Sequence, residues 1–320
     1  MKITTVLQKN EIQELTQASN LRGFQAVVTT WAMIAGAFCM VAIYPSPFMV
    51  LGALVILGGR HLALAILMHD CAHYSLFRTR ILNDILGRWV CAYPTWQDLK
   101  RYRVHHMDHH KHAGSGKDPD LSLIKSFPIS KSSYVRKILR DLSGISGLKR
   151  IYGLVLMDLG LIKYTVAADV QRLDQKGRTV KQVFREAFGN LHGVVITNVI
   201  LWGVLYSLGH PWLYLLWVVS YLTTFSVFVR IRSIAEHAYT LEGLDPLKNT
   251  RTTLANFLAR ITVAPHRVNY HLEHHLLMTV PYFNLPRLHS VLKERGALKG
   301  AFLSQGYLEV LQAAVINKSK

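Results

Sequence analysis

The sequence predicts an all-α membrane protein, in which four transmembrane helices form two hairpins and a cytoplasmic helical cap carries clusters of histidine. Three observations predict this fold class. Of the 320 residues, 50% are hydrophobic, yet the formal net charge is +18. The apolar residues are concentrated in four long stretches. Almost all Lys and Arg residues lie outside those stretches, as in a membrane protein with basic regions on one side of the bilayer.

Each apolar stretch is about long enough for a helix to cross a hydrocarbon core of ~30 Å. A Pro-Ser-Pro turn at 45–47 joins the first two stretches, and a Gly-His-Pro turn at 209–211 joins the last two. These short connections predict two tight helical hairpins. The predicted spans are Phe24–Tyr44, Phe48–Met68, Leu191–Leu208 and Trp212–Val229.

The distribution of basic residues predicts the orientation of the chain. Neither hairpin turn contains Lys or Arg, so both turns are expected to face away from the cytoplasm. We therefore expect one integral-membrane domain over 1–320, with 1–23, 69–190 and 230–320 in the cytoplasm. In a bacterium this would be the inner membrane. The polar N-terminus does not resemble a signal peptide, and three scattered cysteines indicate a reducing compartment.

The segment 151–162 is apolar but too short to span a membrane, and it contains Asp158. It is expected to be an interfacial helix or a buried helix of the cap. Arg60 and His61 interrupt the second apolar stretch. We expect that helix to project beyond the bilayer, so that Arg60 reaches the interface by snorkelling. A functional role inside the membrane is the alternative.

Histidines are concentrated in three short motifs, all in regions assigned to the cytoplasm. HDCAH has histidines at i and i+4, whereas HMDHH and HLEHH have them at i, i+3 and i+4. On a helix these spacings place the side chains on one face. A further histidine follows the fourth apolar stretch. We therefore expect four helices to converge on one pocket, with the candidate metal ligands His69, His73, His106, His109, His110, His237, His271, His274 and His275.

Nine imidazoles are too many for one metal ion, because zinc takes four ligands in structural sites and three protein ligands in catalytic sites. They suit two ions with four or five nitrogens each. Imidazole binds iron, copper, zinc and nickel. A site that opens towards lipid suggests a hydrocarbon substrate, and oxidation of an unactivated C–H bond favours iron over zinc.

Acidic residues next to the candidate ligands could orient them. Ligating histidines usually donate their second ring N–H to a carboxylate or a carbonyl. Neighbours along a helix point to different faces, so each acid could equally be solvated or bind a histidine of another element. The candidates are Asp70, Asp108, Glu236 and Glu273.

The run HHMDHHKH at 105–112 allows two helical stripes of histidine. His105, His109 and His112 form one stripe, and His106, His109 and His110 form the other. HLEHH repeats the second pattern, with an acid at the same place and no extra histidine. We therefore assign the second stripe as ligands and expect His105 and His112 to be surface residues that tolerate alanine; contacts to the ligands or to lipid head groups are the alternative.

With these motifs the sequence resembles the membrane fatty acid desaturase and hydroxylase superfamily, and most closely its bacterial members without a fused electron-transfer domain. The resemblance covers about residues 24–295. The segments that carry it are HDCAHYSLF with LNDILG (69–87), YRVHHMDHHKHAGSGKDPD (102–120) and VNYHLEHHLLMTVPYFNLPRLH (268–289).

The resemblance implies a non-haem centre of two Fe²⁺ ions, with the nine histidines as ligands and O₂ as co-substrate. Among these ligands His237 rests on a single histidine after a span rather than on a motif. The expected reaction is desaturation of a fatty acyl chain. Hydroxylation or ketolation of a fatty acyl, sphingoid or carotenoid chain is the alternative.

Electrons are expected to come from a separate protein. The sequence contains no HPGG haem motif, no CxxC pattern and no GxGxxG motif, so the donor would be a ferredoxin, a rubredoxin or a cytochrome b5. The basic region 69–189 could attract an acidic donor or an acyl carrier, or it could bind anionic lipid head groups. The spans already explain the charge, so no nucleic-acid partner is expected.

Two other classes of protein remain as remote alternatives. A zinc-dependent membrane hydrolase would carry an HExxH-type motif, and the sequence has none. A metal transporter would place ionisable ligands across the bilayer midplane, whereas these histidines are expected at one face.

Overall fold

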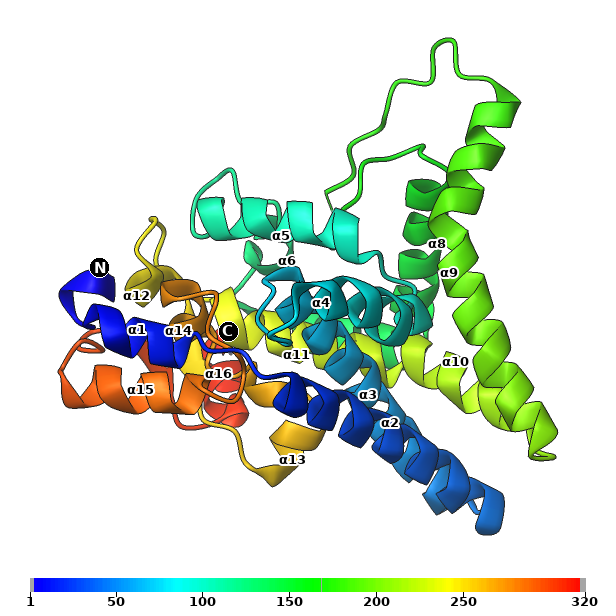
Figure 1. Cartoon of the computed structure of the whole chain (residues 1–320), viewed down its shortest axis with the longest axis horizontal. Helices are drawn as coiled ribbons and strands as arrows, with labels where there is room; N and C mark the ends of the chain where they lie inside the picture. The colour runs from blue at the N-terminus through cyan, green and yellow to red at the C-terminus, as the bar shows by residue number, and fades with distance from the viewer. Residues whose placement is uncertain (1–2, 168, 317–320) are drawn as a thin grey trace.

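The computed structural model describes residues 3–167 and 169–316 and is mostly helical. Four helical segments are long and apolar enough to cross a membrane, which confirms the predicted fold class. They extend to one side of the molecule, and the remaining helices form a cap on the other side (Figure 1). The candidate spans are Lys9–Ile43, Pro47–Ala72, Val180–Ser207 and Pro211–His237. That the whole chain is one domain stays a prediction.

The first hairpin consists of α2 (Asn20–Ile43) and α3 (Pro47–Ala72). Ser46 caps α3 by accepting a hydrogen bond from the Met49 backbone N–H at 3.3 Å, and Pro47 occupies the first turn, where its missing N–H costs nothing. The predicted span ended at Met68 and the helix was expected to project beyond the bilayer; in the structure it continues for one more turn, to Ala72. This extra turn carries His69 into the cap.

The second hairpin consists of α9 (Val180–Ser207), η4 (Pro211–Leu213), α10 (Tyr214–Leu222) and α11 (Thr224–His237). The sequence predicted one continuous helix for its second arm, but the helix breaks at Thr223. Thr224 donates a hydrogen bond to the Leu54 carbonyl of α3 at 2.6 Å. A Cβ on Gly58 would lie 2.2 Å from the Thr224 hydroxyl, so only glycine permits this approach.

The cap contains short helices and, unexpectedly for an all-α prediction, two small parallel sheets. Strand β1 (Ile129–Ser130) pairs with β4 (Val315–Ile316), and β2 (Arg251–Thr253) pairs with β3 (Phe302–Ser304). The cap helices are η1 (Ile3–Thr5), α1 (Lys9–Leu15), α4 (Arg80–Leu86), η2 (Gly87–Ala92), η3 (Tyr93–Thr95), α5 (Leu99–His112), α6 (Leu121–Ile124), α7 (Lys131–Leu142), α8 (Ile145–Asp158), α12 (Pro246–Asn249), α13 (Phe257–Ile261), η5 (Pro265–Arg267), α14 (His271–Leu276), α15 (Leu285–Glu294) and α16 (Tyr307–Ala314).

The apolar segment at 151–162 lies mostly in α8, which begins earlier than the sequence indicated. One edge of α8 is buried, and its Asp158 accepts a hydrogen bond from the Trp96 indole at 2.9 Å. The other edge exposes Leu148 and Tyr152. Because the helix has both a buried and an exposed apolar edge, its place at the membrane interface stays a prediction.

Arg60 does not snorkel as predicted, and its neighbour His61 is also buried. Arg60 is 4% exposed and donates to the Ile261 carbonyl at 2.7 Å, so it is buried in the protein instead of snorkelling to the interface. The Nε2 atom of His61 lies 3.0 Å from the Trp217 carbonyl oxygen and 3.2 Å from the Ser220 hydroxyl. Both side chains therefore connect α3 to neighbouring segments, although the buried Arg60 Nε and His61 Nδ1 have no hydrogen-bond partner in the described chain.

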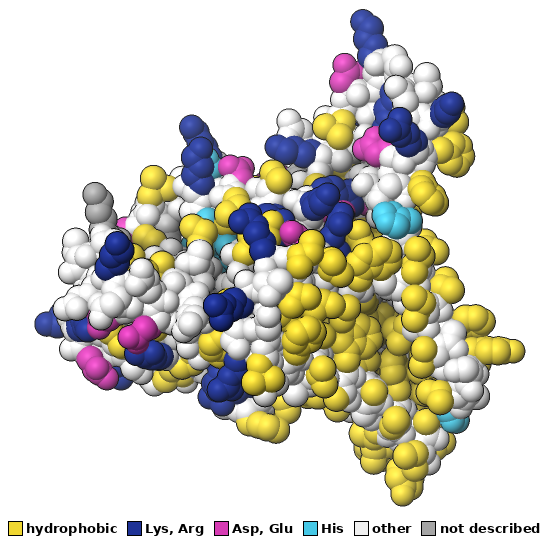
Figure 2. Space-filling view, in the orientation of Figure 1, with side chains coloured by type: hydrophobic (Ala, Val, Ile, Leu, Met, Phe, Trp, Pro, Cys, Tyr) yellow, Lys and Arg dark blue, Asp and Glu magenta, His cyan; other side chains and the backbone are white. Residues whose placement is uncertain are grey.

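The surface divides into an apolar part and a charged part. Hydrophobic side chains cover the side formed by the long helices, and Lys and Arg side chains gather over the cap (Figure 2). Helix α9 contributes strongly to the apolar part, with Val195, Val199 and Ile200 among its exposed residues. Such a large apolar surface is what a bilayer would cover.

Candidate metal centre

The structure brings together all nine histidines that the sequence singled out. They form two adjacent groups, and within each group one ring nitrogen per residue lies within 4.8 Å of every other. The five-histidine group consists of His69, His73, His106, His110 and His274, and the four-histidine group consists of His109, His237, His271 and His275.

Helices α3 and α5 supply most of the five-histidine group. His69 lies in the last turn of α3 and His73 is its C-cap, so the i, i+4 spacing puts both rings on one side. Asp98 caps the N-terminus of α5, because its carboxylate accepts a hydrogen bond from the Arg101 backbone N–H at 2.8 Å. Arg103 then fastens α5 to α3, because its Nε donates to the Ala72 carbonyl at 2.9 Å.

A buried arginine fixes the end of α11, which carries His237. The Arg251 guanidinium donates to the carbonyls of Ile234, Ala235, Ala238 and Tyr239 at 2.9–3.3 Å. These carbonyls lie at or just beyond the last turn of α11, where helical partners are missing. Arg251 therefore takes the place of a C-terminal cap.

Helix α14, which carries the last three histidines, is held by its own glutamate. The Glu273 carboxylate accepts from the Thr252 hydroxyl at 2.5 Å and pairs with the His289 Nδ1 at 2.6 Å. Glu273 is fully buried, so these contacts compensate for the hydrogen bonds to water that its carboxylate gives up on burial. They connect α14 to β2 and α15.

The nitrogens of the five-histidine group approach one another closely. His274 Nε2 lies 3.0 Å from His69 Nε2 and 3.0 Å from His110 Nε2. His110 Nε2 in turn lies 3.1 Å from His106 Nε2. In the described chain, the buried Nε2 of His73 has no hydrogen-bond partner.

The ring nitrogens of the four-histidine group also lie close together. His237 Nε2 lies 2.7 Å from His271 Nε2, which lies 3.1 Å from His275 Nε2. The two groups adjoin each other, because the rings of His110 and His275 have centroids 4.3 Å apart. The two groups are thus parts of one centre.

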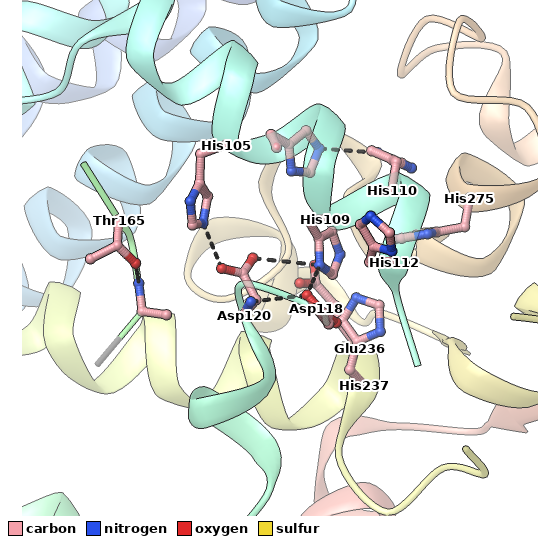
Figure 3. Close-up of polar contacts among 12 residues, drawn as sticks. His105, His109, His110, His112, Asp118, Asp120, Thr165, Glu236, His237 and His275 are labelled. Atoms are coloured by element: carbon pink, nitrogen blue, oxygen red, sulfur yellow. Dashed lines mark hydrogen bonds and ion pairs between the residues drawn. The ribbon is translucent and has the colours of Figure 1, made fainter. Parts of the chain in front are cut away.

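The second ring nitrogens of several of these histidines bind oxygen atoms. His69 Nδ1 lies 2.9 Å from Asp70 Oδ1. Figure 3 shows the second such contact, in which His109 Nδ1 lies 2.8 Å from Asp118 Oδ1. His237 Nδ1 lies 3.0 Å from the Asn249 carbonyl oxygen. Since only N–H can donate to these oxygens, Nδ1 carries the proton and Nε2 keeps a free lone pair for a metal.

The protonation states also suit metal binding. Burial lowers the pKa of His73 to about 3 and that of His110 to about 2, with further lowering by nearby Arg103 and His73, respectively. Burial also lowers the pKa of His274. For His109 burial lowers the pKa, but the hydrogen bond to Asp118 and the nearby carboxylates of Asp120, Asp118 and Glu236 together outweigh burial, so the net pKa is raised. Most rings are therefore neutral.

Where neither nitrogen of such a pair carries a proton, two lone pairs face each other at about 3 Å, and a cation between them would remove their repulsion. The all-imidazole donor set, its burial and these Nε2 contacts fit a pair of transition-metal ions. Among the described residues both groups contain only histidine and no carboxylate or thiol. The two clusters therefore form a candidate di-metal centre.

Only two of the four acids expected to orient ligands contact a histidine of the two groups. Asp70 Oδ1 lies 2.9 Å from His69 Nδ1. Glu236 Oε1 lies 3.5 Å from His271 Nδ1, and the same oxygen accepts a hydrogen bond from Arg232. The other two acids, Asp108 and Glu273, have partners outside the two histidine groups. Asp108 is largely exposed and lies 3.6 Å from His112, and Glu273 binds Thr252 and His289 instead.

Asp118 and the Asn249 carbonyl were not anticipated. Asp118 lies in the turn after α5, and the only signal in the sequence was the turn-forming run GSGKDPD next to the second histidine motif. The Asn249 contact comes from the backbone, so no residue type could have indicated it.

His105 differs from its prediction as a surface residue. It is buried, and its Nε2 lies 2.8 Å from Asp120 Oδ1 (Figure 3). The Asp120 backbone N–H donates to Asp118 Oδ1 at 2.9 Å. His105 thus holds the turn that supports His109. His112 lies outside both groups and is half-buried.

Comparisons with known proteins agree with this geometry. A family described as "Fatty acid desaturase" matches residues 45–307. The chain is 27% identical to the dihydrorhizobitoxine desaturase of Bradyrhizobium elkanii, over 88% of this chain and 78% of the relative. It is 24% identical to an sn-1 acyl-lipid omega-3 desaturase (ferredoxin) of Nostoc sp., over 72% and 64%. An 88-residue stretch is 34% identical to beta-carotene 4-ketolase 3 of Haematococcus lacustris, over 25% and 28%.

Proposed function

The chain belongs to the fatty acid desaturase family, and on that premise we propose that it is a di-iron oxidoreductase that uses O₂ to form a double bond in a fatty acyl chain. The observation that carries the proposal is the double cluster of nine buried histidines beside an apolar helix bundle. Each cluster offers enough nitrogen donors to hold one ion.

Iron suits this centre better than zinc. A catalytic zinc site uses three protein ligands, whereas these groups offer five and four imidazoles. Bound iron would supply the O₂ activation that oxidation of an unactivated C–H bond needs. The proposed ligands are His69, His73, His106, His110 and His274 for one ion, and His109, His237, His271 and His275 for the other.

The protein's own contribution is to orient the Nε2 atoms of the histidines towards the centre and to limit the access of water to them. Three histidines donate a hydrogen bond from Nδ1–H to an oxygen atom: His69 to Asp70, His109 to Asp118 and His237 to the Asn249 carbonyl. Each bond orients the ring so that its Nε2 points into the centre. Seven of the nine histidines are buried and the other two are half-buried, which keeps most bulk water away from the rings. Tyr102 stacks on His106 with ring centroids 5.1 Å apart and fixes that ring.

The proposed substrate is a lipid acyl chain. The apolar surface of the helix bundle would admit it from the bilayer, and two of the relatives named above are desaturases, one of them acting on acyl lipids. The similarity to a carotene ketolase supports the second candidate, insertion of oxygen into a hydrocarbon chain. That similarity covers only a quarter of this chain, so desaturation is preferred.

The proposed electron donor is a separate ferredoxin-type protein that docks on the cap. The relative from Nostoc carries ferredoxin in its name, and the Lys and Arg residues on the cap would attract an acidic donor (Figure 2). With basic regions on the inside, the cap and its histidines would face the cytoplasm.

Expression in a host that supplies ferredoxin and its reductase, followed by mass spectrometry of the total lipids, tests the proposal. A new product about two mass units lighter than a host acyl chain means desaturation, and one about sixteen units heavier means hydroxylation. A protein with neither product, and with zinc in place of iron, would instead be a membrane zinc protein or a metal transporter.

A further inference from the structure

A pocket of about 340 Å³ lies away from the histidine groups, between the first half of α2 and the segment that leads into α14. Helix α2 contributes Gln25, Ala26 and Thr29, and the remaining lining comes from α13, η5 and the loop after α14. Its full lining is Gln25, Ala26, Thr29, Arg260, Ala264, His266, Arg267 and Tyr282.

The pocket carries uncompensated positive charge. Arg260 and Arg267 both line it, and neither makes an ion pair with any carboxylate in the described chain. No acidic residue is among the lining residues. A third arginine, Arg60, lies behind the pocket, where it donates to the Ile261 carbonyl. The pocket therefore carries a net positive charge that no lining residue offsets.

Three other polar side chains of the pocket, those of Thr29, Tyr282 and His266, already have hydrogen-bond partners within the protein. Thr29 donates to the Gln25 carbonyl at 2.6 Å, and Tyr282 donates to the Arg22 carbonyl at 3.2 Å. His266 Nε2 lies 3.0 Å from the Thr30 hydroxyl, and burial, with help from Arg60, lowers the pKa of His266 to about 3. His266 is thus neutral.

The backbone beneath the pocket is strained. His266 and Arg267 are consecutive non-glycine residues with φ of 49° and 60°, in the left-handed region. Each such residue costs about 1–3 kcal/mol, and strain of this kind persists where the surrounding structure enforces it, often at ligand sites. Here it presents the Arg267 side chain to the pocket.

Exposed apolar side chains lie close to the pocket. Next to it, α13 exposes Phe257 and Leu258, with exposed fractions of 78% and 65%, and α2 exposes Phe24 and Val28. In Figure 2, Lys and Arg side chains adjoin hydrophobic surface in the region where α13 lies in Figure 1. Apolar side chains below a basic pocket are the arrangement expected at the head-group layer.

We propose that this pocket binds the phosphate of a net-negative glycerophospholipid head group, such as that of phosphatidylglycerol. Two guanidinium groups can bind phosphate oxygens with charge-assisted hydrogen bonds. A zwitterionic head group would bring its own cation next to Arg260 and Arg267, and without a lining carboxylate that cation would meet only repulsion. The exposed Phe257 and Leu258 would contact the acyl chains.

The test is native mass spectrometry of the detergent-solubilised protein titrated with dioleoyl phosphatidylglycerol, with dioleoyl phosphatidylcholine in a parallel titration. We expect the double variant R260Q/R267Q to weaken the first phosphatidylglycerol binding step by about tenfold or more, since two charged hydrogen-bond donors are lost. The matched control K131Q/R136Q removes two exposed charges from α7, outside the pocket, and should change this step little.

Arg260 is exposed, so R260Q alone should fold and show part of the loss if the double variant does not fold. Equal losses in the pocket and control variants, or equally tight phosphatidylcholine binding, would overturn the proposal. Displacement of the lipid by about 10 mM inorganic phosphate would assign the pocket to a free anion instead. The measurement is repeated after iron is removed with a chelator, so its result is independent of the proposed reaction.

Discussion

The Nε2 atoms of His237 and His271 lie 2.7 Å apart, although one residue ends α11 and the other begins α14. The Nδ1 atom of His237 donates to the Asn249 carbonyl, so its Nε2 faces His271 without a proton. Two buried imidazole nitrogens this close to each other share either a proton or a metal cation. The same pattern recurs at His69 and His274, 3.0 Å apart, in the neighbouring group.

Substitution of His274 tests the five-histidine group. His274 contacts both His69 and His110, so His274→Ala should remove iron from that group and abolish product. The loss of activity should exceed the ~10–100-fold expected when only a carboxylate partner of a ligand is lost. Iron content and lipid product are measured together. His210→Ala, in the second hairpin turn and outside both groups, is the control; an iron-replete, active His274→Ala protein would disprove the site.

Asp118 is expected to position His109. Replacing it by Asn removes the charge that the His109 Nδ1–H faces at 2.8 Å, so Asp118→Asn should weaken iron retention by about 10–100-fold. The measurement is the chelator concentration that removes half of the iron. Asp108→Asn is the matched control, because Asp108 is largely exposed and lies on no member of the groups. Equal iron retention in both variants would show that Asp118 has no such role.

Arg251 should matter to stability, whereas a surface arginine should not. Arg251→Gln leaves buried carbonyls at the end of α11 without donors, at a cost of about 1–3 kcal/mol. Its thermal unfolding midpoint should therefore fall. Arg287→Gln breaks an ion pair with Glu14 in which both side chains are more than half exposed, so the midpoint should hardly change. A midpoint that falls equally in both variants would contradict this explanation.

The contact between α1 and α15 should depend on pH. The hydrogen bond from Arg295, followed by one from the Gln8 backbone, lowers the pKa of Glu11 from 4.5 to about 2. A lowered acid pKa stabilises the folded state above pH 4.5, and that stabilisation is lost as the pH falls from 4.5 towards 2. Hydrogen exchange of α1 should therefore quicken over this range, beyond the intrinsic pH trend.

The variant Glu11→Gln should show no such pH-dependent release of α1. Glu14→Gln removes the neighbouring acid without touching the Glu11–Arg295 pair, so it should behave like the unsubstituted protein. If α1 loosens identically in all three proteins, the Glu11 carboxylate is not responsible.

The sequence predicted the parts of the centre that depend on helical periodicity. His69 with His73, and the two motifs at i, i+3 and i+4, recur on single helix faces, which is why the convergence of all nine rings could be expected. The break at Thr223 could not be expected, because the apolar pattern continues through it. It depends on the close approach of Thr224 to Gly58, a contact between distant segments.

The polar partners of the centre were harder to predict because they follow the tertiary fold. Asp108 is adjacent in sequence to a member of the groups but points away, whereas Asp118 reaches His109 from a separate turn. His105 appeared to be a spare histidine, yet it is buried against Asp120. Similarly, Arg60 is buried because α13 folds back to offer it a carbonyl, which hydropathy does not reveal.

Metal analysis of the purified protein tests the central claim most directly. The two groups predict about two iron atoms per chain, with His274→Ala and His237→Ala each depleting iron. Elemental analysis by mass spectrometry, made on the same sample that forms product with its electron donor, gives the ratio. About two irons in the active protein is the expected result. An active protein that contains zinc and no iron would contradict the account.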